Sequence, residues 1–488
     1  MKLPPSPLIY EINTWPWLTE LARLTGRPVD LASVPDDQWD AIAALGFDAV
    51  WLMGVWRRSP AGVAIARADK LLMEWFARSL DDFTDDDVVG SPYCVCDYVV
   101  DDHLGGDDAL AVAREQLARR GVGLILDFVP NHVALDHPWT AQPEWFIRGS
   151  ADDLERDPHS YVTVDGGAVL ANGRDPHFPA WRDVVQVNAY APGLRAAAAD
   201  TLRQIAGRCD GVRCDMAMLM MNDIVARTWG EAAGAIPDAD YWPPIIDAVR
   251  AGHPGFVFIA EAYWGTEAAL AAQGFDFCYD KTLYDVLAHD PARLRPTLGA
   301  DGRTPQRLVR FIENHDEDRA AVVFSDRDRM AAVTALTQAG ARLVHQGQME
   351  GRRARVPVQL RRFRDEPVDA DRAVFYRALL AALADPVFSH GEWRLCDVRG
   401  SSDAVVAWER AGQTRWVVAV NVGDRPATLT LAGFADVPVV ESPLTGEQVR
   451  VSPDGVLAVS LMAWGWQLYR ARPGSGCRWH RRRPRADP

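Results

Sequence analysis

The chain has 488 residues, more than one ordinary hydrophobic core accommodates, so one large unit with one or two smaller ones is expected. Hydrophobic residues make up 48% and charged residues 24%, which is a globular composition. The formal net charge of -15 at pH 7 argues against nucleic acid or an anionic membrane as the main partner.

Seven cysteines without the spacing of a disulfide framework favour reduced thiols and a cytoplasmic protein. Cys94 and Cys96 have no second Cys/His pair at zinc spacing, so a structural role is expected for them. The first residues lack the apolar stretch of a signal peptide, and no run reaches the ~18 apolar residues of a membrane span. Eighteen tryptophans offer rings that can stack on the apolar faces of sugars.

Apolar segments that predict strands alternate with segments that predict helices. The predicted strands lie at 8–17, 47–56, 123–132, 211–217, 256–263, 275–280, 308–316 and 341–347, the first running into an aromatic loop. Predicted helices include 36–45, 107–120, 194–207 and 329–339. This alternation indicates parallel βαβ units, and eight strands close a barrel, so the chain is predicted to be an α/β protein with a (β/α)8 TIM barrel.

Three segments depart from this alternation of strands and helices. Residues 57–97 are rich in Asp and aromatics and are predicted to be a loop excursion with a short helix. Residues 133–187 combine Pro, Gly and Asp without a strong period, which indicates a small inserted subdomain after the third strand. From 395 on, short alternating strands separated by turn signals predict a C-terminal antiparallel β-sandwich.

The predicted domains are therefore a barrel at 1–394 that contains the insert at 133–187, an all-β domain at 395–471, and a basic tail at 472–488. The tail is expected to be disordered and solvated, in preference to a nucleic-acid patch.

The fourth predicted strand ends in an arginine and a carboxylate two residues apart, Arg213 and Asp215. Residues at i and i+2 of a strand project from the same face, so the cation would keep Asp215 ionised and ready to act as a nucleophile. The alternative is a structural Arg–Asp pair. The active site of a (β/α)8 barrel lies at the C-terminal ends of its strands. Polar residues at the other strand ends would therefore favour the nucleophile over a structural pair. Polar residues are found at four such ends: Asp127, Asn131 and His132; Arg213 and Asp215; Glu261; His315 and Asp316.

Four motifs at these ends resemble, in the same order, the signature regions of the α-amylase family of glycoside hydrolases. They are DFVPNH at 127–132, GVRCDMA at 211–217, IAEAY at 259–263 and FIENHD at 311–316. The insert and the β domain also match that family, so the resemblance covers about residues 8–470. It implies that Asp215 is the nucleophile, that Glu261 is the general acid/base, and that Asp316 binds sugar hydroxyls and stabilises the transition state.

The resemblance also implies substrate-binding roles. Arg213 would orient Asp215, Asp127 would tie the third strand to Arg213, and His132 and His315 would hold sugar hydroxyls. Tyr93 lies four residues before Asp97, as the family's stacking tyrosine precedes an aspartate, and would support the same sugar ring. Trp264 is also predicted to bind substrate, apart from the resemblance.

A retaining glycosidase needs two carboxyl groups about 5–5.5 Å apart, one ionised and one protonated. Arg213 should lower the pKa of Asp215. The apolar neighbours of Glu261 in the sequence, Ala260, Ala262, Tyr263 and Trp264, should raise its pKa. These opposite shifts would suit a nucleophile and an acid.

Two departures from the family are expected to matter. Amylases usually carry Lys-His three and four residues after the nucleophile, where this chain has Met218 and Leu219, so its leaving-group side should differ. Asn131 matches a calcium ligand of many members, but Asn188 takes the place of the acidic ligand. Calcium is therefore a possible rather than a required cofactor.

The predicted function is a retaining glycosidase that acts on α-glucosidic bonds of an oligosaccharide or α-glucan. A transglycosylase or α-glucosyl isomerase of the same family is the close alternative, and a non-catalytic carbohydrate-binding barrel is the third interpretation. A metal-assisted or phosphate-binding barrel enzyme is disfavoured, since the chain has no Gly-rich phosphate motif at the last two strands. The sequence leaves the sugar, the endo or exo mode and the oligomeric state open.

Overall fold

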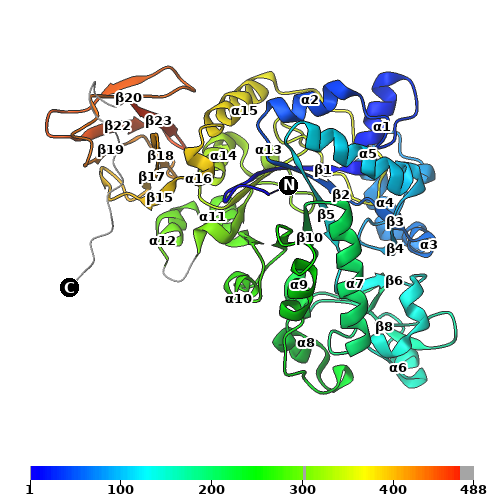
Figure 1. Ribbon diagram of the computed structural model, residues 1–488. Helices are drawn as coiled ribbons and strands as arrows, with labels where there is room; N and C mark the ends of the chain where they lie inside the picture. The colour runs from blue at the N-terminus through cyan, green and yellow to red at the C-terminus, as the bar shows by residue number, and fades with distance from the viewer. Residues whose placement is uncertain (1, 301–303, 473–488) are drawn as a thin grey trace. The chain divides into compact units, whose positions relative to one another are not determined.

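The computed structural model describes residues 2–300 and 304–472 (Figure 1). Its central element is a closed barrel of parallel strands in the order β1-β14-β13-β12-β11-β10-β5-β2. These strands are β1 (Leu8–Asn13), β2 (Ala49–Met53), β5 (Gly123–Phe128), β10 (Gly211–Cys214), β11 (Val257–Ala260), β12 (Phe277–Tyr279), β13 (Leu308–Arg310) and β14 (Ala341–His345). Nearly all of their residues are buried, as in parallel sheets covered on both faces. The predicted fold class is confirmed.

The internal contacts divide the chain into two compact units. The N-terminal unit consists mainly of Ile9–Tyr279 and Ala354–Glu366. The C-terminal unit consists mainly of Asp280–Arg353 and the chain from Pro367 onward. This division runs between strands of the barrel and does not coincide with the predicted domain boundary between 394 and 395. That boundary therefore stays a prediction. The predicted disordered tail lies, from residue 473 on, outside the described residues.

Helices follow the barrel strands of the N-terminal unit. They are α1 (Thr14–Thr25), α2 (Asp36–Ala44), α5 (Gly106–Arg119), α7 (Pro192–Arg208), α8 (Asn222–Trp229), α9 (Trp242–Arg250) and α10 (Glu267–Ala272). The expected aromatic loop at 14–17 is wrong, because these residues form the first turn of α1. Pro16 lies in that turn, where its missing N–H leaves no intrahelical bond unmade, and Trp17 and Leu18 are buried.

The segment 57–97 is more ordered than the expected loop with one short helix. It contains most of β3 (Trp56–Arg58), α3 (Pro60–Ala68), α4 (Lys70–Ser79) and the start of β4 (Val95–Val100). The Ser59 side chain accepts a hydrogen bond from the first turn of α3, and Asp69 does the same for α4. These caps begin two helices within a stretch whose composition resembles a loop.

The predicted insert contains a small sheet of its own in the order β6-β9-β8-β7. Its strands are β6 (His132–Ala134), β7 (Tyr161–Thr163), β8 (Val169–Gly173) and β9 (Trp181–Gln186). All of their pairings are antiparallel, and His132 pairs with Gln186. The sheet therefore begins at the end of the DFVPNH motif, where the chain leaves the barrel.

Residues 354–366 return to the N-terminal unit and are held there by ion pairs with Asp87. The buried Asp87 carboxylate accepts hydrogen bonds from Arg361 Nε at 3.1 Å, from Arg362 Nε at 2.6 Å and from the Thr84 N–H at 2.9 Å. Although burial acts to raise it, these bonds hold the pKa of Asp87 well below its ordinary range.

Asp87→Asn is expected to lower the free energy of unfolding by about 1.5–3 kcal/mol at pH 7, because charge-assisted hydrogen bonds are lost. A depressed pKa stabilises the folded state above the unfolded-state value of about 3.9 and ceases to do so as the pH falls. The difference between wild type and variant in urea unfolding should therefore shrink below pH 4. A difference that grew on acidification would contradict the assignment.

The C-terminal unit ends in two antiparallel sheets. The larger has the order β15-β17-β18-β23-β20-β21 and the smaller β16-β19-β22. Their strands are β15 (Glu392–Leu395), β16 (Arg399–Gly400), β17 (Val405–Ala411), β18 (Arg415–Asn421), β19 (Ala427–Leu431), β20 (Val439–Glu441), β21 (Gln448–Arg450), β22 (Leu457–Leu461) and β23 (Trp466–Arg472). One buried apolar cluster contains side chains of both sheets, among them Val417 and Leu429, which confirms the predicted β-sandwich.

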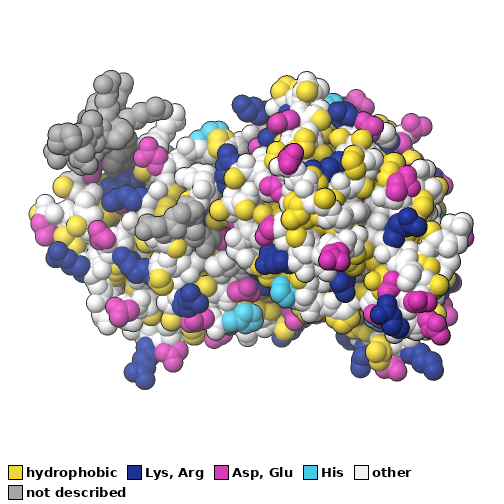
Figure 2. Space-filling view, turned by 90° about the horizontal axis from the view of Figure 1, so that it is seen from below, with side chains coloured by type: hydrophobic (Ala, Val, Ile, Leu, Met, Phe, Trp, Pro, Cys, Tyr) yellow, Lys and Arg dark blue, Asp and Glu magenta, His cyan; other side chains and the backbone are white. Residues whose placement is uncertain are grey.

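Within the described residues, no helix combines the length and apolar character needed to cross a membrane. The six cysteines that the structure describes are free thiols. On the face shown in Figure 2, acidic and basic side chains are interspersed.

Candidate active site

The predicted nucleophile and acid directly follow two neighbouring strands. β10 pairs with β5 and β11, so that Arg213 lies opposite Asp127 on one side and Ile259 on the other. Asp215 follows β10 directly, and its N–H donates to Phe128 O at 2.8 Å. Glu261 follows β11, and its N–H donates to Cys214 O at 3.0 Å. The strand-end positions predicted from the motifs are thereby realised within the N-terminal unit.

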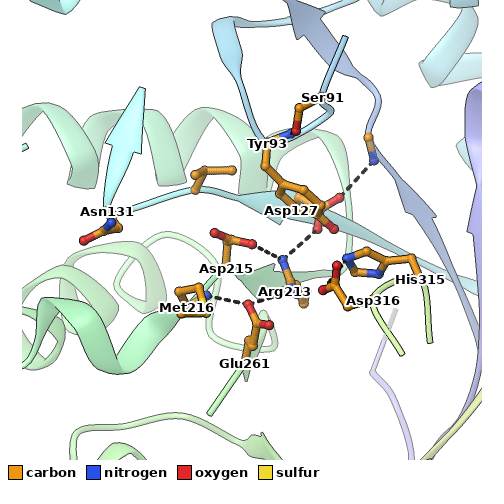
Figure 3. Close-up of polar contacts among 12 residues, drawn as sticks. Ser91, Tyr93, Asp127, Asn131, Arg213, Asp215, Met216, Glu261, His315 and Asp316 are labelled. Carbon is orange, nitrogen blue, oxygen red and sulfur yellow. Dashed lines mark hydrogen bonds and ion pairs between the residues drawn. The ribbon is translucent and has the colours of Figure 1, made fainter. Parts of the chain in front are cut away.

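One guanidinium contacts three carboxylates in this unit (Figure 3). Arg213 Nη1 lies 2.7 Å from Asp215 Oδ1 and 3.7 Å from Asp127 Oδ1, and Nη2 lies 2.7 Å from Glu261 Oε2. The Arg213 side chain is 1% exposed. Burial acts to lower its pKa, but Glu261, Tyr93, Tyr279 and Asp215 together raise the pKa of Arg213 well above its ordinary value. It therefore stays a cation, as the sequence predicts.

Aromatic rings enclose the same guanidinium. The Arg213 Cζ lies 5.3 Å from the ring centroid of Trp51, 5.1 Å from Tyr93 and 5.8 Å from Tyr279. Such cation–π contacts favour a charge that has lost its water. Tyr93 was expected to support the sugar ring; its contact with Arg213 assigns it a place beside the nucleophile, and the sugar contact stays a prediction.

Asp127 connects Arg213 to the preceding strands. Its Oδ2 accepts a hydrogen bond from the Gly54 N–H at 3.0 Å, and Trp56 Nε1 donates to its carbonyl at 2.8 Å. Gly54 has φ +77°, and a Cβ there would come within 2.6 Å of Pro92. Only glycine fits this close approach, which brings the backbone amide to Asp127.

The purely apolar environment expected for Glu261 is wrong, because hydrogen-bond donors and a guanidinium contact its buried carboxylate. Its Oε2 accepts from the Met216 N–H at 2.6 Å and faces Arg213, and its Oε1 accepts from the Tyr263 hydroxyl at 2.8 Å. The side chain is 3% exposed. Donors of this kind favour the ionised carboxylate. The sequence neighbours were a poor guide because the donors come from another strand end and from a hydroxyl.

His132 is buried at the start of β6. Its ring packs edge-on against Trp181 with a centroid distance of 5.2 Å, and Asn131 Nδ2 lies 3.3 Å from its Nδ1. Burial lowers the pKa of His132 to about 4, so the ring is neutral at pH 7. A neutral imidazole can both donate to and accept from a hydroxyl, which fits the predicted sugar-binding role.

The donors around Asn131 do not fit a calcium site. Asn131 Oδ1 accepts from Gln186 Nε2 at 2.8 Å, and Asn188 Oδ1 accepts from the Tyr190 N–H at 3.0 Å. Both amide oxygens thus point to protein donors, whereas Ca²⁺ requires several oxygens directed at one point. Among residues 2–300 and 304–472, no cluster of three or more His, Cys, Asp or Glu side chains is arranged to hold a metal ion.

His315 and Asp316 belong to the C-terminal unit, just beyond β13. The N–H groups of Asp316 and Glu317 both donate to Asn314 Oδ1 at 2.9 Å, and His315 Nε2 lies 3.0 Å from Asp316 Oδ2. The turn is thus fixed locally, and the roles of both residues against a substrate stay predictions.

A buried cluster around Glu313 directly precedes that turn in the sequence. Glu313 Oε1 lies 2.5 Å from Arg319 Nη1 and 2.9 Å from His345 Nδ1, and its Oε2 accepts from the Ala320 N–H at 2.7 Å. Although burial acts to raise it, Arg319 and His345 lower the pKa of Glu313.

The residues expected on the leaving-group side and at the pocket differ in exposure. Met218 and Leu219 lie in a short 3-10 helix (Ala217–Met220) and are buried, and the expected difference on the leaving-group side stays a prediction. They are apolar because they pack inward. Trp264 is 45% exposed, and its ring meets His177 of the insert edge-on at a centroid distance of 4.7 Å. Its φ of 59° is rare for a bulky residue, and strain of this kind often accompanies functional sites.

Four residues of the site were not singled out from the sequence: Trp51, Met216, Tyr263 and Tyr279. Tyr263 could have been identified from the sequence, since it lies two residues after Glu261 and can project to the same side. Met216 could not have been identified in this way, because it acts through its backbone N–H.

No protein-family model matches the chain. It is 28% identical over 342 residues to the α-amylase MalA of Haloarcula japonica, which covers 65% of this chain and 45% of that relative. The chain thus spans less than half the length of the curated relative that it matches. The α-amylase of Geobacillus thermoleovorans, solved with acarbose, superimposes with a TM-score of 0.68 at 19% identity, covering 97% of this chain and 99% of that one.

Other solved structures agree with this fold. The α-amylase of Lactobacillus plantarum has a TM-score of 0.66 at 19% identity, covering 96% of this chain and 99% of that one. The debranching enzyme of Nostoc punctiforme has a TM-score of 0.64 at 16% identity, with the same coverage of 96% and 99%. The resemblance to the α-amylase family is confirmed in sequence and in fold.

Proposed function

We propose that this chain is a retaining glycoside hydrolase that cleaves α-glucosidic bonds of oligosaccharides or α-glucans. One observation carries the proposal: Asp215 and Glu261 leave adjacent strands and lie at the two ends of one buried guanidinium. The similarity to α-amylases supports the choice of substrate class.

In the proposed first step, Asp215 Oδ attacks the anomeric carbon while the glycosidic C–O bond breaks. The leaving oxygen takes the proton of Glu261, and a glycosyl ester of Asp215 remains. In the second step, the Glu261 carboxylate removes a proton from water, whose oxygen attacks the same carbon and releases Asp215. His132, His315 and Asp316 would hold the sugar hydroxyls.

Arg213 serves both steps in this scheme. Its Nη1 keeps Asp215 ionised and fixes the direction of attack, and its Nη2 faces Glu261 Oε2. Because the free enzyme holds Glu261 among donors, the first step requires a proton to be taken up beforehand. We therefore expect activity towards unactivated substrates to fall as the pH rises.

A transglycosylase or α-glucosyl isomerase is the second candidate, and the exposed Trp264 favours it. An aromatic face three residues after Glu261 could stack an acceptor sugar on the leaving-group side, where buried Met218 and Leu219 replace the family's Lys-His. Products from maltose, maltotetraose and sucrose separate the two: glucose indicates hydrolysis, whereas longer or rearranged saccharides indicate transfer.

Glu261→Gln is expected to reduce kcat/KM on maltotetraose by about 10²–10⁴-fold, because the amide cannot supply the proton. With α-glucosyl fluoride the first step should persist, since fluoride leaves without protonation. Free fluoride would then appear in a burst, and added azide, which needs no base, should restore turnover and give glucosyl azide.

Glu267→Gln, in the first turn of α10, is the matched control and should behave like wild type on both substrates. Equal losses on maltotetraose and on the fluoride, without rescue by azide, would exclude Glu261 as the acid/base.

The proposed location is cytoplasmic. The free thiols of the described cysteines support a reducing compartment.

A further inference from the structure

The two oxygens of Glu261 stand in different surroundings. Oε2 lies 2.7 Å from the Arg213 guanidinium and 2.6 Å from the Met216 nitrogen, whose N–H donates to it. Oε1 lies 2.8 Å from the Tyr263 hydroxyl. The carboxylate is buried, so it cannot exchange these partners for bulk water without moving.

A proton cannot readily reside on Oε2. A hydrogen there would point at a cation and at a backbone donor, and neither group can accept it. Met216 is held in this position by its left-handed backbone, with φ 40°, and Ala217 N–H donates to Glu261 O at 3.1 Å. The turn after β10 therefore fixes Oε2 as an acceptor only.

Oε1 differs because a hydroxyl is both donor and acceptor. Tyr263 can donate to Oε1 when Glu261 is ionised and can accept from it when Glu261 is protonated. Either state keeps a hydrogen bond, so the proton can be gained and lost without disturbing the Arg213 contact. The bond to the ionised oxygen is charge-assisted and therefore stronger, so Tyr263 favours the ionised form.

We propose that Oε1 of Glu261 is the oxygen that exchanges the proton with the glycosidic oxygen, and that Tyr263 is a positioning residue which holds Oε1 and stabilises its ionised form. This inference rests on the proposed function. It specifies which carboxylate oxygen carries the proton and which side chain sets the pH at which it does so.

The charged and titratable groups near Glu261 come from several strands of the N-terminal unit. Arg213 lies on β10, Asp215 follows it directly, and Tyr279 lies on β12. Asp127 on β5 contacts the same Arg213, and Glu11 on β1 acts on Tyr279. Burial raises the pKa of Tyr279 well above its ordinary value, so it remains neutral over the working range. Removing the Tyr263 hydroxyl leaves each of these charges in place.

Tyr263→Phe is the direct test. The variant loses one donor to the ionised carboxylate, so the protonated form persists to higher pH. We expect the basic limb of kcat/KM on maltotetraose to move up by about one pH unit. On α-glucosyl fluoride, whose departure needs no proton, the first step should change less than threefold, and the acidic limb should stay where it is.

Two comparisons keep the result specific. Tyr190→Phe removes the hydroxyl that donates to Asn222 O at 2.6 Å in the same unit, and its pH profile should match wild type. In a Glu261→Gln background, Tyr263→Phe should have almost no further effect on maltotetraose, because the two residues act as one unit. Thermal unfolding of each variant shows whether it has folded.

A uniform loss at every pH and for both substrates would overturn the inference, since it would show only a structural role. So would an unshifted profile in a folded variant, or additive effects in the double variant. A wild type inert towards α-glucosyl fluoride would remove the proposed function and this inference together. An active wild type with an unshifted variant would remove the inference alone.

Discussion

Asp215→Asn is expected to reduce kcat/KM on α-glucosyl fluoride by about 10⁴–10⁶-fold, the scale seen when a catalytic nucleophile is removed. The amide has nearly the same volume and can keep the place beside Arg213, but it cannot attack the anomeric carbon. Since fluoride needs no acid, this substrate isolates the nucleophilic step from the role of Glu261.

Asp223→Asn is the matched control, because Asp223 is an exposed carboxylate paired with Arg227 on α8. It should leave the rate within about twofold of wild type, as most surface changes do little. If Asp215→Asn kept more than a tenth of wild-type activity, the proposed mechanism would be wrong.

The covalent intermediate offers an independent check on the same residue. A 5-fluoro-α-glucosyl fluoride slows both steps and should leave a glycosyl ester on the peptide that contains Asp215. Peptide mass spectrometry locates the added mass. A label on any other carboxylate would assign the nucleophile elsewhere, and an absent label with an active enzyme would favour direct attack by water.

The barrel could be predicted from the sequence because its strands are largely apolar and polar residues collect at their C-terminal ends. β5 illustrates this: Gly123–Phe128 is wholly buried, Asp127 is its second-last residue, and Asn131 and His132 of the same motif follow it. The helices of 57–97 could not be predicted in the same way. Their beginnings depend on single caps at Ser59 and Asp69, and their burial depends on Leu360, nearly 300 residues further along the chain.

In the candidate site, contacts that depend on side-chain identity could be predicted, whereas contacts that depend on the direction of the backbone could not. Arg213 and Asp215 were placed correctly because strand periodicity alone sets which side chains share a face. The surroundings of Glu261 were predicted wrongly, because one donor is the Met216 N–H, which a φ of 40° turns towards the carboxylate. Every residue except proline has a backbone N–H, so a pattern of residue types does not show which of these groups points into a site.

Arg213→Met is expected to lower the free energy of unfolding by about 3–5 kcal/mol at pH 7, the usual cost of breaking a buried ion pair by removing one partner. The loss arises because Asp127, Asp215 and Glu261, all buried, would face one another without their common cation. Methionine has a similar length and no charge, so little of the effect should come from lost volume. Urea unfolding at pH 7 measures it.

The pH dependence of this loss distinguishes charge from packing. Without the cation, the buried carboxylates bind protons more tightly in the folded than in the unfolded state, so the variant should become less unstable as the pH falls. The gap to wild type should narrow by pH 4.5, whereas a packing defect would cost the same at both pH values. Arg227→Met, which breaks the exposed pair with Asp223, should cost at most about 0.5 kcal/mol.

A second substitution then separates folding from catalysis. Adding Asp215→Asn to Arg213→Met removes one of the unpaired charges and should recover part of the lost stability at pH 7, although both variants are inactive. If stability instead fell further, Asp215 would be held mainly by contacts other than Arg213. The guanidinium would then not be the group that keeps the nucleophile ionised, and the pairing at the end of β10 would be structural.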